Sequence, residues 1–84
     1  MKHSAEMVVT NRKSFIEFLQ VFLEEYEQEG KTWENNTLAS FLKAMAAYAA
    51  DVQGCYNNME PGINADVPTW KVFADILRGA AVYE

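Results

Sequence analysis

The chain has 84 residues, which suits one domain, and half of them are apolar, which excludes a disordered protein. Its net charge of −5 argues against direct binding to nucleic acid, because phosphate contacts require a basic surface. No apolar run approaches the ~18 residues that span a membrane, and one cysteine without a second fits a reducing compartment, so we expect a cytoplasmic protein.

A short leader and a first helix begin the chain. Residues 1–10 form the leader, which lacks the apolar core of a signal peptide and whose apolar residues can fold back onto the domain. Apolar residues then recur at helical spacing, which predicts a helix over roughly residues 12–29. Asn11 is a suitable N-cap, and Gly30 ends the segment. The apolar positions of this helix cover more than one narrow stripe, so we expect it to be contacted on two sides.

The central helix is the most readable one, and we predict it over residues 37–53. Its apolar stripe is the widest in the chain. Asn36 and Thr37 offer side-chain oxygens to the unpaired N–H groups of the first turn. Gly54 marks the expected end, because glycine readily takes the left-handed conformation of a helix C-cap.

Turn-forming residues fill the stretch after the central helix, where we expect a long loop with one further helical turn around residues 56–59. The last helix is predicted over residues 68–82, with Pro68 in its first turn and Asp66 as the candidate cap. Gly79 within it indicates a close helix crossing. No stretch alternates as a strand does. The sequence therefore predicts an all-α fold, a small single-domain helical bundle of three main helices plus short extra turns.

The negative charge is concentrated in one segment. Between Glu17 and Glu34 there are six acidic residues against Lys31 alone, whereas the rest of the chain carries six of each sign. Acids near the C-terminal end of the first helix oppose its dipole, at a cost of ~0.3–1 kcal/mol each. They form either a solvated helix face or a surface that attracts a basic protein.

The second interpretation supplies ten candidate partner-binding residues. The acidic segment runs into a loop with an aromatic residue and amides, and the long loop after the central helix offers a further set. We expect Trp33, like Trp70, to be buried, as a plug between the first two helices. The candidates are Glu24, Glu25, Glu27, Glu29, Trp33, Glu34, Asn35, Tyr56, Asn57 and Asn58.

No pattern of residues points to catalysis. His3, the one histidine, lies in the leader, and Cys55 has no cation or base close in sequence to activate its thiol. The spacings of phosphate loops, nucleophilic serine turns and metal ligands do not occur. We therefore expect no enzyme activity, no cofactor and no metal.

With its helices placed, the chain resembles a family of small bacterial domains of unknown function. Members share a W-E-N-x-T-L opening, an F-L-x-A-M-A-A run, a Y-x-N turn and a P-x-W-K-x-F-A-D-I-L helix that ends in Y-E, and the resemblance covers roughly residues 11–84. It implies a helical fold and supplies no activity. Ala39 and Ser40 replace the usual acidic pair after Thr-Leu, which removes the acidic half of a capping box.

By type, the chain also resembles immunity proteins of contact-dependent growth inhibition and related toxin systems, which are small, acidic and cytoplasmic. This resemblance implies a monomer that binds a cognate toxin 1:1. The toxin would be a basic protein, such as an RNase-type nuclease, whose active site the acidic surface occludes. The alternative is a small cytoplasmic interaction or regulatory domain with another partner. The residues alone do not separate the two.

Overall fold

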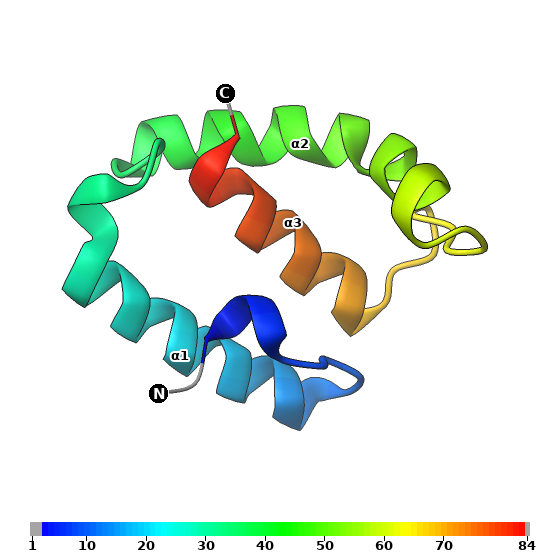
Figure 1. Ribbon diagram of the computed structural model, residues 1–84, viewed down its shortest axis with the longest axis horizontal. Coiled ribbons are helices and arrows are strands. Elements are labelled where there is room, and N and C mark those ends of the chain that lie inside the picture. The colour runs from blue at the N-terminus through cyan, green and yellow to red at the C-terminus, as the bar shows by residue number, and fades with distance from the viewer. Residues whose placement is uncertain (1–2, 84) are drawn as a thin grey trace.

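The computed structural model describes residues 3–83 and contains three α-helices and two short 3-10 turns in that range. No strand occurs among these residues, so the predicted all-α fold with three main helices and short extra turns is confirmed. In chain order the elements are η1 (Ser4–Glu6), α1 (Arg12–Glu29), η2 (Gly30–Thr32), α2 (Leu38–Met59) and α3 (Trp70–Val82) (Figure 1).

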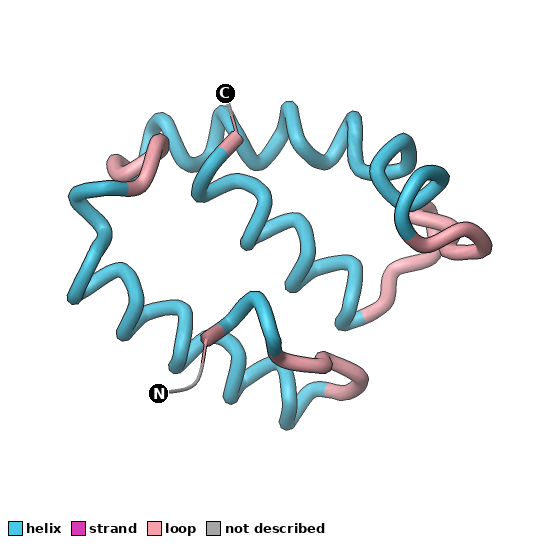
Figure 2. The backbone as a smooth tube through the Cα atoms, viewed as in Figure 1, coloured by secondary structure: helices cyan, strands magenta, loops and turns pink. Residues whose placement is uncertain are grey.

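The last helix lies between the other two. α3 packs most extensively on α2 and also on α1, while α1 and α2 form the two sides (Figures 1 and 2). The molecule measures 34 × 27 × 18 Å. A helix with its side chains is about 10–12 Å wide, so the shortest dimension holds one layer of helices plus the leader. The leader with η1 crosses one face of this layer, beside α1 and α3.

Side chains cap the start of each α-helix. The Asn11 side chain accepts a hydrogen bond from the Ser14 N–H, as the sequence predicts. The Thr37 side chain caps α2 by accepting a hydrogen bond from the Ser40 N–H, and the Ser40 hydroxyl oxygen accepts one from the Thr37 backbone N–H, which completes a capping box without an acid. The acidic half of the box is absent, as the sequence indicates, and the Ser40 hydroxyl takes its place. At α3 the cap is Thr69, so the helix starts at Trp70 and neither Asp66 nor Pro68 has the predicted role.

The predicted end of the central helix is also wrong, because α2 continues through Gly54 to Met59. Tyr56 lies one turn after Val52, and both side chains pack against Val72 of α3, which holds this part of the helix in place. A proline disfavours the helical conformation at the residue that precedes it. Pro61 therefore accounts for the non-helical backbone of Glu60 and for the end of α2 at Met59. The expected extra turn at residues 56–59 is helical, but it belongs to α2.

Two clusters of buried side chains form the core. Val9, Phe18 and Ala74 join the leader to α1 and α3, and Val9 is only 4% exposed, so the leader folds back as predicted. Val52, Tyr56 and Val72 join α2 to α3. Trp33 and Trp70 were expected to be buried, and this is correct only in part, because each packs against aromatic neighbours but remains partly exposed.

The helix α3 approaches α2 closely at Gly79, as the sequence predicts. A Cβ atom built on Gly79 would lie 2.3 Å from the ring of Tyr48, far inside contact distance. Glycine is therefore required there by the space that the Tyr48 ring occupies.

Candidate functional site

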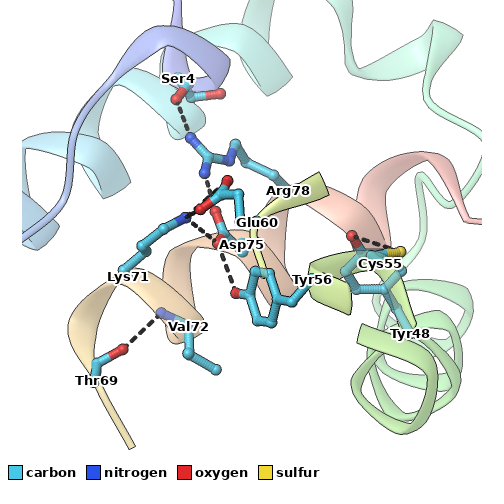
Figure 3. Close-up of polar contacts among 10 residues, drawn as sticks. All are labelled: Ser4, Tyr48, Cys55, Tyr56, Glu60, Thr69, Lys71, Val72, Asp75 and Arg78. Carbon is cyan, nitrogen blue, oxygen red and sulfur yellow. Dashed lines mark hydrogen bonds and ion pairs between the residues drawn. The ribbon is translucent and has the colours of Figure 1, made fainter. Parts of the chain in front are cut away.

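The densest polar cluster surrounds Asp75 on the face of α3 that the leader crosses (Figure 3). Tyr56 donates its hydroxyl to an Asp75 carboxylate oxygen at 2.7 Å, and Lys71 lies 2.8 Å from the same oxygen. Arg78 pairs with the other oxygen and donates a second N–H to the Ser4 carbonyl at 2.7 Å. The cluster therefore links α2, α3 and the leader.

The pKa values in this cluster follow from its geometry. Burial would raise the pKa of Asp75, but hydrogen bonds from Lys71, Tyr56 and Arg78 outweigh burial and lower it below its ordinary value. Burial and the hydrogen bond to Asp75 both raise the pKa of the Tyr56 hydroxyl. At neutral pH, Asp75 is therefore ionised and Tyr56 is protonated, and each of these states strengthens the hydrogen bond between them. The cluster therefore joins the helices, and its groups are already paired with one another.

Tyr56 was expected in an exposed loop, and this expectation is wrong. Its side chain is only 5% exposed, because α2 continues and turns that side chain onto α3. Asn57 and Asn58 are exposed on the last turn of α2, where Asn57 accepts a hydrogen bond from Gln53. The Gln53 side chain also binds the backbone of Ile63 and Ala65, which fixes the connection to α3.

The cysteine lies at the edge of a hollow of about 310 Å³ beside the polar cluster. The Sγ atom of Cys55 is 4.0 Å from the Tyr48 hydroxyl, and the cation that also lines the hollow, Arg78, is already paired with Asp75. His3 is elsewhere, with Nδ1 3.8 Å from the Glu25 carboxylate. Within residues 3–83, no group of three His, Cys, Asp or Glu side chains is placed to hold a metal. Neither Cys55 nor His3 thus has the neighbour that a nucleophile or a general base would need.

The acidic candidates divide into two sets. Glu24, Glu27, Glu29 and Glu34 are exposed, and no ion pair reaches them within residues 3–83. Glu25 differs, because it accepts hydrogen bonds from the backbone N–H of Ser4 at 3.1 Å and from its hydroxyl. Glu25 therefore fastens the leader to α1, and its carboxylate is not free for a partner.

The loop candidates also have internal roles. Trp33 packs on Phe22 with ring centroids 4.9 Å apart and on Tyr26 at 5.3 Å, both on α1. It also lines a hollow at the junction of α1 and α2, so the predicted plug between these helices is correct only in part. The side-chain NH₂ of Asn35 donates hydrogen bonds to the backbone carbonyls of Ala80 and Tyr83, and its backbone N–H donates to the carbonyl of Ala81. Asn35 thus satisfies the free carbonyls at the end of α3. Sequence reasoning missed this role, because the two ends of the contact lie 45 and more residues apart.

An exposed apolar surface, which sequence reasoning missed, occupies the space between α1 and α2. It has two hollows, of about 400 Å³ at the junction of α1 and α2 and about 560 Å³ over α3. Phe15 lines one hollow and Leu19, one turn later, lines the other, so the two adjoin. We call this surface the open face. Its large exposed side chains are Leu19, Leu23, Tyr26, Leu38, Leu42 and Phe73.

At the open face, the expectation that α1 is contacted on two sides holds only in part. Phe18 packs on the leader and α3, and Phe22 contacts Trp33 and Phe41, but Leu23 is 57% exposed. In the sequence, the wide apolar surface of α1 was the signal that could have indicated the open face. Contiguous exposed apolar side chains typically mark a surface for contact with another molecule. No helix among the described residues is long and apolar enough to cross a membrane.

Comparison of the sequence and structure with known proteins identifies a family but no function. The model of a family of unknown function, DUF7660, matches residues 11–84. No curated protein and no solved structure matches the chain.

Proposed function

The chain belongs to DUF7660, a family of unknown function, and we propose that it acts as a protein-binding domain whose partner is a basic protein. The binding surface is the acidic end of α1, which we define by Glu24, Glu27, Glu29 and Glu34. Binding, and not catalysis, is the proposed activity, because the densest polar cluster, around Asp75, is engaged in holding the helices together.

The observation that carries the proposal is the unpaired negative charge at one end of a helix. α1 is 18 residues long and has no basic residue in its last turn, so its negative dipole end and three exposed carboxylates add their fields. Beside them is a shallow hollow of about 610 Å³ lined by Tyr26, Glu27, Lys31 and Asn36, among others. Glu27 and the amide oxygens of the hollow can accept hydrogen bonds from a lysine or arginine side chain of a partner, although Lys31 balances the charge of Glu27 there.

We propose a toxin as the partner, on the strength of the resemblance in type to immunity proteins. A nuclease toxin needs a basic groove to hold phosphates, and the carboxylates at the end of α1 would occupy that groove in place of the substrate. The protein would then act in the cytoplasm, where such a toxin meets its substrate. The second candidate is a regulatory domain that binds another basic protein through the same surface.

The test compares capture of partners from the source organism by wild type and by a variant with Glu24→Gln, Glu27→Gln and Glu29→Gln. We expect the variant to lose basic proteins that wild type retains at low salt. The matched control combines Glu6→Gln, Glu17→Gln and Asp66→Asn, which removes the same amount of charge elsewhere. This control should still retain the basic proteins. Equal capture by all three proteins would refute the acidic end as the binding surface.

A second measurement separates the two candidate functions. If a captured protein degrades nucleic acid, adding this chain at equal concentration should abolish that activity, and the three-Gln variant should inhibit at least tenfold less tightly, equivalent to ~1.4 kcal/mol. Capture of basic proteins that carry no toxic activity would favour the regulatory domain instead.

A further inference from the structure

We propose that the open face binds a second copy of this chain, so that two three-helix layers pack against each other as a homodimer. This replaces the monomer that the sequence suggests. The open face adjoins the acidic end of α1, because Tyr26 and Asn36 line a hollow of each, but the proposal rests on the apolar side chains and does not depend on the function proposed above.

The first argument is that the open face is too apolar to be left in water. Leu23, Leu42 and Phe73, one from each helix, are 57%, 52% and 43% exposed. Monomers rarely expose contiguous apolar patches larger than a few hundred Å². Domains usually bury such faces between two layers of secondary structure, and at 18 Å this molecule has one layer of helices plus the leader. A second layer is missing, and another copy of the chain would supply it.

The second argument concerns charge. Within residues 3–83, no Asp, Glu, Lys or Arg lines either hollow of the open face. Two chains that each carry a net charge of −5 repel each other, but the hollows themselves bring no charged side chain into the contact. A basic protein, by contrast, finds no carboxylate in the hollows to pair with. Charge therefore favours an apolar occupant, and a two-fold interface places the same uncharged patch on both sides.

The third argument concerns size and shape. A stable interface buries about 800 Å² on each partner, and the open face draws large exposed apolar side chains from all three helices across a molecule that extends 34 by 27 Å. Leu42 and Phe73 project at the hollow over α3, so the same side chains of a second copy can enter that hollow. Ala46 and Ala49 on its α2 side are small and let the two helices approach closely.

The test is the oligomeric state of the whole chain in solution. Sedimentation equilibrium over a range of concentrations should give twice the 9.5 kDa mass of one chain for the wild type. Leu42→Lys should raise the dimer dissociation constant about 100-fold, since a symmetric dimer loses the burial of two leucines. Met59→Lys is the matched control, because Met59 is on the same helix and 80% exposed but lines neither hollow of the open face. It should leave the dimer intact.

Circular dichroism keeps the result interpretable. Lysine forms helix well and Leu42 is half exposed, so the variant should keep its helical signal while it dissociates. If Leu42→Lys loses that signal, Phe73→Ser serves as the second variant on the same face. A wild type that sediments as a monomer at all concentrations would overturn the proposal and leave the open face to a different protein. A dimer that both open-face variants leave intact would overturn it as well, by placing the interface elsewhere.

Discussion

The Asp75 carboxylate contacts three side chains, Tyr56 of α2 and Lys71 and Arg78 of α3, and these contacts use its negative charge. Asp75→Asn keeps the shape of the side chain but leaves Lys71 and Arg78 facing a neutral amide, with the carboxylate only 12% exposed. We expect a loss of about 2–3 kcal/mol of unfolding free energy, below the full cost of breaking a deeply buried pair. Urea denaturation measures it. Asp66→Asn, an exposed control, should change stability by less than about 0.5 kcal/mol.

The same residue predicts a pH dependence. Because folding lowers the pKa of Asp75, its contribution to stability is complete above the unfolded pKa of about 3.9 and is lost as the pH falls through the lower folded value. Wild type should therefore lose stability on acidification below about pH 4, and Asp75→Asn should lose less over that range. Parallel curves for the two proteins, in urea melts at several pH values, would contradict this assignment.

The roles of single residues were predictable where the contact is local. Asn11 and Thr37 cap helices through N–H groups three residues ahead, so the sequence places donor and acceptor together. Asn35 and Tyr56 instead contact residues of α3 that no local pattern brings near. For that reason, sequence reasoning assigned both to a partner surface, and the structure places them in internal contacts.

At the scale of elements, two glycines in helices make opposite predictions. Gly54 lies inside α2, and a Cβ atom added to it would meet nothing within 4 Å, so Gly54→Ala should stabilise the protein by about 1 kcal/mol through helix propensity. At Gly79 the same change forces the Tyr48 ring to move, and we expect a net loss of about 1–3 kcal/mol. Thermal melts of the two variants check both signs. Destabilisation by Gly54→Ala would indicate that α2 ends there after all.

Helix positions followed from periodicity, but helix ends did not always follow. The predicted range of residues 12–29 for the first helix matches α1, because Asn11 and Gly30 lie directly at its ends. Gly54 permits a left-handed C-cap but does not impose one, and the packing of Val52 and Tyr56 on Val72 favours continuation. Packing between elements decided the end of α2, and that packing is absent from any single segment of sequence.

For the whole molecule, the helical class was predictable and the arrangement was not. Three apolar stripes imply three helices that pack together, but they do not say which helix lies in the middle. Because α3 takes that place, α1 and α2 are held apart and their inner sides remain exposed. The open face is thus a consequence of helix order, and it explains why α1 has more apolar positions than its contacts use.

The uneven charge of the molecule makes a prediction that needs no partner. Glu24, Glu27 and Glu29 repel one another and the dipole at the C-terminal end of α1, with no basic residue in the last turn to relieve them. Replacing all three by Gln changes the net charge from −5 to −2 and should raise the unfolding free energy by about 1 kcal/mol at low salt.

The dependence of unfolding free energy on salt concentration tests whether the gain in the three-Gln variant is electrostatic. Sodium chloride at physiological strength screens charges over about 8 Å, so it should stabilise wild type and narrow the difference between wild type and the three-Gln variant. The dispersed control, Glu6→Gln with Glu17→Gln and Asp66→Asn, carries the same net charge but leaves the end of α1 intact, and it should gain less. Urea melts at one protein concentration, which keeps any self-association constant, measure all three. An equal gain in the control would attribute the effect to net charge, and the acidic end of α1 would then have no special electrostatic cost for a basic partner to relieve.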